Sequence, residues 1–150
     1  MRNRKKDNSK EEKNENYSRE WTISGTIYIL LKYKKWQLKD RKKLTLKQFQ
    51  IECCNDLYTD LGIQKTPVQV RDKINNTRSS YYVLKKQIEN KKNKTSTTPT
   101  KIENEIFLNK RILNIMDTLY NKDCVVTVEE IETKIFELVQ NHRNRRHHYD

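Results

Sequence analysis

The chain has 150 residues, a net charge of +12 from 32 Lys+Arg against 20 Asp+Glu, and only 33% apolar residues. That apolar fraction lies below the roughly 45–50% of globular domains, so we expect a small core with polar margins. Two glycines are too few for P-loop or dinucleotide-binding turns, and we expect neither a membrane span nor a secretory signal, because no apolar run is long enough for either. We therefore expect an intracellular, helical and basic protein.

Most of the excess positive charge lies in the middle of the chain. Residues 21–100 hold seventeen basic and six acidic residues, whereas residues 101–150 hold eight and nine. A basic block beside a neutral one favours a local binding site for a polyanion. The alternative is a lysine-rich background of the kind that an AT-rich genome produces, but this leaves the neutral last fifty residues unexplained.

Residues 1–19 are polar and charged without an apolar period, and they are predicted to form a disordered basic arm. The apolar spacing after Trp21 predicts a first helix capped by Thr22 or Ser24. Its buried face is predicted to contain Ile23, Ile27, Leu30, Leu31 and Tyr33. A second helix is predicted from Thr45, a possible cap, to Gly62, which is expected in the left-handed conformation after a helix end. Its buried stripe consists of Leu46, Phe49, Cys53, Leu57 and Leu61.

The clearest local signal is the pair Thr66 and Pro67, an N-cap residue followed by proline at the first helical position. We expect a third helix from there to about Asn90. Its apolar stripe recurs every three or four residues and consists of Val70, Ile74, Thr77, Tyr81, Leu84 and Ile88. Three helices joined by short loops predict a compact domain over residues 20–90.

Residues 91–100 are predicted to be a linker, and residues 101–141 a helical hairpin. The second helix of this hairpin begins with a capping box formed by Thr127 and Glu130. Residues 142–150 are predicted to be a frayed basic tail, which suits phosphate contact or nuclear localisation and equally suits a solvated end.

The hairpin has too many apolar positions to be solvated on both sides. Either it packs on the first domain, or it docks on a larger protein subunit or on a second copy. The residues predicted for docking are Ile106, Ile112, Met116, Leu119, Ile131, Ile135 and Leu138.

The third helix has the two faces that a helix-turn-helix recognition helix needs, one apolar and one short and polar. Asn and Gln pair with adenine and Arg with guanine, whereas lysines supply phosphate contacts. The predicted base contacts are Gln69, Arg71, Asp72, Asn75, Asn76, Arg78 and Ser79. The predicted phosphate contacts are Lys34, Lys35, Arg41, Lys42, Lys43, Lys47, Lys65 and Lys73. The alternative is an ordinary bundle with a solvated polar face.

No residue pattern points to catalysis, a metal, a cofactor or a small-molecule substrate. Cys53 and Cys54 are adjacent and Cys124 is isolated, a spacing that does not suit zinc. Cys53 is better explained as a core residue and Cys54 as its partly buried neighbour. The glutamates after Thr127 fit helix capping and the helix dipole better than acid–base catalysis.

The order of several residues resembles the Myb/SANT-like DNA-binding domains, including their trihelix and homeobox-like variants. The resemblance covers residues 20–90 and rests on Trp21, the apolar run 27–33, Phe49, Leu57, Gly62, Ile63, Thr66, the run 69–74 and Tyr81. Thr66, Gln69, Arg71 and Lys73 match the T-x-x-Q-x-R-x-K run that opens the recognition helix. The sequence departs from the family at the second tryptophan, which is Phe49, and near the third, where Val70 and Ile74 stand.

This resemblance implies a nuclear, non-catalytic protein that binds duplex DNA through a helix-turn-helix unit. The small size and the Asn-, Lys- and Ile-rich composition are also similar to the homeobox-like accessory subunits of ciliate DNA N6-adenine methyltransferase complexes. That similarity implies a subunit that recruits a larger complex to DNA. The alternative is a protein-interaction scaffold of a chromatin complex, on which the basic surface is incidental.

Overall fold

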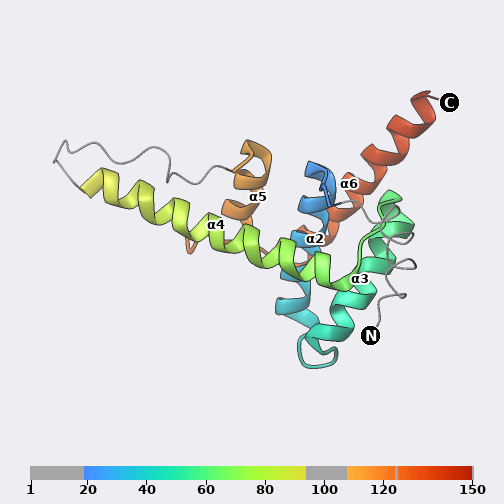
Figure 1. Ribbon diagram of the computed structural model, residues 1–150, viewed down its shortest axis with the longest axis horizontal. Coiled ribbons are helices and arrows are strands. Elements are labelled where there is room, and N and C mark those ends of the chain that lie inside the picture. The colour runs from blue at the N-terminus through green and yellow to red at the C-terminus, as the bar shows by residue number, and fades with distance from the viewer. Residues whose placement is uncertain (1–18, 94–107, 124, 150) are drawn as a thin grey trace, which may run out of the picture.

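The computed structural model describes residues 19–93, 108–123 and 125–149, and these residues form helices without any strand (Figure 1). The helices are α2 (Ile23–Lys35), its π-helical extension η1 (Trp36–Asp40), α3 (Leu46–Leu61), α4 (Pro67–Asn93), α5 (Lys110–Tyr120) and α6 (Val128–Tyr149). The predicted all-α class is confirmed for this part of the chain. The predicted arm, apart from Arg19, and the predicted linker after Asn93 lie outside the described residues. None of the described helices is long and apolar enough to cross a membrane.

Side-chain caps define the starts of the helices, as the sequence predicted. Thr22 Oγ1 accepts a hydrogen bond from the Gly25 amide at 2.9 Å. Three later helices begin with reciprocal capping boxes, formed by the pairs Thr45 and Gln48, Thr66 and Gln69, and Thr127 and Glu130. The α3 helix ends at Gly62, whose φ of 70° is the left-handed conformation expected there. These short-range signals are sufficient because each cap satisfies an otherwise unpaired backbone amide.

Two helix ends differ from the prediction. The α6 helix continues to Tyr149, so the expected helix end at residue 141 and the frayed tail after it are wrong. No glycine or proline interrupts residues 128–149, and arginines near a helix C-terminus are favourable to the helix dipole. The connection expected after α2 also begins as helix, because η1 continues to Asp40.

The α2 helix is the centre of the molecule and contacts α3, α4, α5 and α6 (Figure 1). Every residue from Gly25 to Leu31 is buried, so α2 contributes to two apolar clusters on different sides. On one side, Tyr28 and Ile29 pack with side chains of α3 and α4. This first cluster contains Tyr28, Ile29, Trp36, Phe49, Cys53, Leu57, Leu61, Val70, Ile74 and Val139. A helix that is apolar on all sides must be buried on all sides.

The second cluster brings the C-terminal helices onto α2. It contains Ile27, Leu30, Leu31, Tyr81, Ile112, Met116, Leu119 and Ile131. Ile135 and Leu138 are half-buried against both clusters. These α5 and α6 residues therefore cover the second face of α2 within this chain, which corrects the prediction that they dock on a partner. The structure shows the alternative, in which the C-terminal helices pack on the first three helices of the same chain. Ile106 lies outside the described residues.

Hydrogen-bonded tyrosine side chains join the helices at three points. The Tyr28 hydroxyl donates to Asp60 Oδ2 at 2.5 Å between α2 and α3, and the Tyr81 hydroxyl donates to Asp117 Oδ1 at 2.7 Å between α4 and α5. The Tyr120 hydroxyl donates to Gln37 Oε1 at 2.7 Å, which connects the end of α5 to η1. Because each hydroxyl is satisfied, large aromatic rings can be buried without leaving a polar atom unpaired.

Candidate nucleic-acid interface

The outward side of α4 carries most of the residues predicted to contact bases. Arg71, Asp72, Asn75, Asn76 and Ser79 are all exposed there. Arg71 is held by its neighbour, since its Nε and Nη2 atoms each lie 3.0 Å from Asp72 Oδ1. This surface ion pair is weak and can exchange for another acceptor. We call these five residues the outer face of α4.

Two predicted base contacts are engaged elsewhere, which corrects their assignment. Gln69 belongs to the capping box of α4, where its Oε1 accepts from the Thr66 amide at 2.9 Å. Arg78 lies between aromatic rings, with its guanidinium carbon 5.1 Å from the ring centre of Tyr33 and 5.3 Å from that of Tyr120. The sequence could not show this, because Tyr120 belongs to a helix forty residues further along the chain.

Four of the predicted phosphate contacts form an exposed group where η1 leads into α3. This group, which we call the basic turn, consists of Arg41, Lys42, Lys43 and Lys47. Arg41 also lies 5.8 Å from the ring centre of Trp36, and the Trp36 indole donates to the Leu44 carbonyl at 2.8 Å. These contacts attach the turn to the core.

The first turns of α3, which carry Lys47 of the basic turn, lie beside the outer face of α4. A small cavity of about 20 Å³ between α3 and α4 is lined by Leu46 and Gln50 from α3 and by Arg71 and Asn75 from α4, together with Tyr33, Phe49 and Ile74. Leu46 and Gln50 flank Lys47 on the first turns of α3. The structure therefore places the helix that carries Lys47 next to the polar face that the sequence predicted to read bases.

The remaining predicted phosphate contacts differ in their surroundings. Lys73 is half-buried on the flank of α4. Lys35 Nζ lies 3.2 Å from Glu132 Oε2, so an α6 carboxylate already compensates its charge. Lys34 Nζ lies 4.4 Å from the ring centre of Tyr120.

Lys65 is not a phosphate contact in this structure, which corrects its assignment. Only 5% of the residue is exposed. Its ammonium donates to the Glu20 carbonyl at 2.5 Å and lies 4.8 Å from the ring centre of Trp21. Burial is the main factor that lowers the pKa of this lysine. Lys65 therefore anchors the segment before α2 to the loop between α3 and α4.

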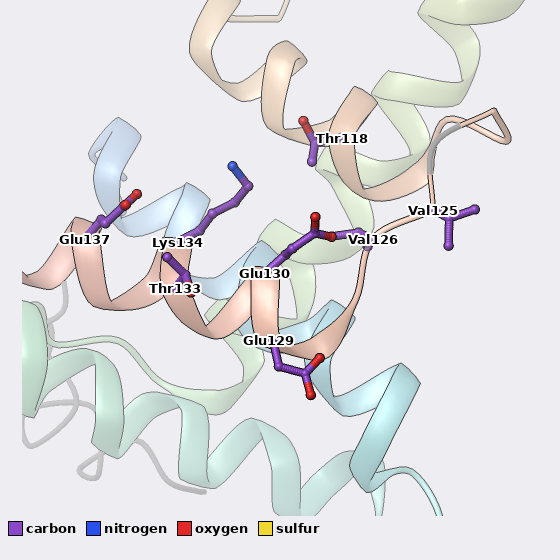
Figure 2. Close-up of a pocket in the computed structure, with 8 residues that line it drawn as sticks. All are labelled: Thr118, Val125, Val126, Glu129, Glu130, Thr133, Lys134 and Glu137. Carbon is purple, nitrogen blue, oxygen red and sulfur yellow. The ribbon is translucent and has the colours of Figure 1, made fainter.

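A larger groove of about 500 Å³ lies between the end of α5 and the first turns of α6 (Figure 2). Its lining contains three carboxylates and one ammonium among Thr118, Val125, Val126, Glu129, Glu130, Thr133, Lys134 and Glu137. Glu130 also caps its helix, as expected, by accepting from the Thr127 amide at 2.8 Å. This groove is not predicted from the sequence, where its local signal is the apolar pair Val125 and Val126 before the capping box. Its negative charge makes it unsuitable for phosphate.

The described cysteines are structural. Cys53 is 2% exposed in the first cluster, and burial raises the pKa of its thiol well above the ordinary value. Burial also raises the pKa of Cys54 to about 11. Both thiols are therefore protonated near neutral pH and poor nucleophiles. Residues 19–93, 108–123 and 125–149 bring together no set of three His, Cys, Asp or Glu side chains that would suit a metal ion.

Comparison of the chain with protein-family models, with curated proteins and with solved structures finds no match. Its function is therefore inferred from the geometry and charge of its surfaces.

Proposed function

We propose that this protein is a non-catalytic, nuclear DNA-binding protein that presents the basic turn and the outer face of α4 to duplex DNA. The observation that carries the proposal is the packing of α3, which carries Lys47 of the basic turn, beside the outer face of α4, where Gln50, Arg71 and Asn75 line a small cavity. In this proposal α2, α3 and α4 act as a helix-turn-helix unit of the Myb/SANT-like or homeobox-like kind, with α4 as recognition helix.

The shape and chemistry of α4 suit the DNA major groove. A helix with side chains is roughly 10–12 Å across, and the major groove is about 12 Å wide. The outer face bears mostly short polar side chains that can approach base edges, with Arg71 and Asn75 suited to guanine and adenine. Cations of the basic turn would then lie against the phosphates that border the groove.

The proposed cellular role is that of an accessory subunit that brings a larger complex to DNA. Recruitment of a DNA adenine methyltransferase complex is the narrower form of this proposal. Its support is the similarity in size and composition to ciliate accessory subunits, and nuclear localisation follows from a chromosomal DNA target.

The test is a titration of fluorescent duplex DNA with the full chain at several salt concentrations. We expect micromolar or tighter binding with a log–log salt slope of about −4 or steeper, because each neutralised phosphate contributes about −0.9. Absence of binding, or an affinity that does not change with salt, would refute the proposal.

Arg71→Ala and Asn75→Ala are expected to change sequence preference rather than general affinity. Loss of one bidentate base contact costs about 1–3 kcal/mol of discrimination at one base pair. Binding selection on a randomised duplex pool measures this preference. Arg111→Ala and Asn114→Ala on α5, which also replace an exposed arginine and an exposed asparagine, provide the matched control and should leave the preference intact. Equal losses on every sequence would show that α4 does not read bases.

A second candidate function is protein docking, which the groove of Figure 2 favours. Val125 is 90% exposed at its edge, and three carboxylates lie beside it. This combination suits a partner segment with both basic and apolar side chains. Titration with a synthetic Lys/Leu peptide tests this function, and Glu129→Gln with Glu137→Gln should weaken binding if it is correct. Unchanged affinity would exclude the groove as the docking surface.

A further inference from the structure

Lys34 and Arg78 form a pair of cations among tyrosine rings where α2, α4 and α5 meet. Lys34 Nζ lies 4.4 Å from the ring centre of Tyr120, and the Arg78 guanidinium carbon lies 5.3 Å from the same centre. Arg78 Nη1 donates a long hydrogen bond of 3.4 Å to the Tyr33 hydroxyl. Both cationic residues are only partly exposed.

Neither cation has a carboxylate partner within the described part of the chain. Three other lysines of the same helices do, since Lys32, Lys35 and Lys85 lie 3.0, 3.2 and 3.3 Å from Asp56, Glu132 and Asp117, respectively. The nearby carboxylate of Asp117 is further occupied by the Tyr81 hydroxyl. Arg78 Nε is buried and has no hydrogen-bond acceptor. The two adjacent positive charges of Lys34 and Arg78 are therefore left without an anion, and the Arg78 guanidinium retains one unused donor.

The surroundings make this pair more sensitive to an anion than a fully solvated pair would be. Burial, followed by the nearby charge of Arg78, lowers the pKa of Lys34. The faces of the tyrosine rings offset part of the positive charge. They cannot replace a counterion, because a ring has no formal negative charge.

We propose that Lys34 and Arg78 together bind one phosphate group of a nucleic-acid backbone. This inference rests on the proposed DNA-binding function and gives Arg78 a role different from base recognition. Arg78 follows Arg71 by two helical turns, or about 10 Å, on the same flank of α4. A DNA strand that follows this flank would place a backbone phosphate near Arg78, while Arg71 remains available for a base edge. The planar guanidinium fork suits two phosphate oxygens, and Lys34 adds a point charge.

The site can be tested with two probes, inorganic phosphate and duplex DNA, on the full chain. The variants are Lys34→Met and Arg78→Met, which retain an unbranched apolar stem without the charge, with Lys110→Met at an exposed α5 position as matched control. Thermal unfolding is followed in phosphate and in chloride at equal ionic strength. Duplex binding is measured against salt.

We expect phosphate to raise the unfolding midpoint of the unaltered chain and of Lys110→Met, and to raise it clearly less in both site variants. On duplex DNA, each site variant should lose about tenfold in affinity near 0.1 M salt and about one unit of salt slope. Arg78→Lys should restore most of the slope but less of the affinity, because it restores charge without the fork. If Arg78→Met does not fold, Lys34→Met and Arg78→Lys supply the same comparison.

The failure of this inference can be distinguished from failure of the proposed function. Steep salt-dependent DNA binding that is the same in all variants would overturn the phosphate site and leave DNA binding intact. Phosphate stabilisation that the site variants lose, in a chain that does not bind duplex DNA, would support the site for a different phosphate ligand and refute the DNA function. If neither phosphate nor duplex DNA has an effect, both the phosphate site and the DNA-binding function are overturned. The role of Lys34 and Arg78 would then be limited to packing against the tyrosine rings.

Discussion

Replacement of Ile131 by alanine is expected to lower the free energy of unfolding by about 3 kcal/mol. Ile131 is fully buried in the second cluster, where α6 meets the apolar side of α2 and Tyr81 of α4. The substitution removes buried methyl and methylene groups and leaves a cavity that rigid helices can close only in part. Urea unfolding followed by circular dichroism and by tryptophan fluorescence measures the loss.

The control for this prediction lies on the same helix. Phe136 is 62% exposed, and Phe136→Ala should change stability by less than about 0.5 kcal/mol. Both tryptophans lie at or near α2, so their fluorescence reports the first three helices. Unchanged fluorescence midpoints in Ile131→Ala, with loss of helical signal alone, would mean that α6 unfolds independently of those helices.

Neutralising the four residues of the basic turn with glutamine is expected to have the largest effect on DNA affinity. Each lost phosphate contact should remove about 0.9 from the log–log salt slope. Near 0.1 M salt this corresponds to about tenfold in affinity per contact, so even two true contacts predict about a hundredfold loss on every sequence. Stability should change little, because Arg41, Lys42, Lys43 and Lys47 are exposed.

A variant with the same change in net charge separates the local surface from the total charge. Lys110, Arg111, Lys122 and Lys134 belong to α5, α6 and the turn between them, and their replacement by glutamine also removes four positive charges. We expect it to retain the steep salt slope of the unaltered chain. Equal losses in the two quadruple variants would show that DNA responds only to net charge.

The local features of this fold could be predicted from the sequence, because the interactions that create them lie within four residues. Thr45, Thr66 and Thr127 each cap a helix by hydrogen bonding with the residue three positions later. Gly62 ends α3 because its own backbone adopts the left-handed conformation. The predicted inward stripe of α4 is buried from Val70 to Tyr81, where Val70 and Ile74 pack in the first cluster and Tyr81 in the second. Beyond Tyr81 the stripe is no longer fully covered, and Ile88 is 38% exposed.

The arrangement of the helices could not be predicted from the same patterns. A one-faced stripe was expected for α2, yet Tyr28 and Ile29 are as buried as Leu30. The periodicity of α5 and α6 showed that they hide an apolar face, but not whether α2 or another protein covers it. The roles of Lys65 and Arg78 depend on Trp21 and Tyr120, each more than forty residues away. Such contacts leave no periodic signal.

The π-helical turn η1 determines the direction in which the basic turn faces. In an α-helix each residue advances the chain by about 100°, and a π turn accommodates roughly one extra residue per turn. The five residues of η1 therefore change the angle, measured around the helix axis, between the core-facing side of α2 and the cations that follow it. Trp36 stays in the first cluster while Arg41, Lys42 and Lys43 are exposed. A length difference of a single residue here would rotate the basic turn around the helix axis, so the spacing of residues 36–40 matters to the surface proposed to face DNA as much as the charges themselves.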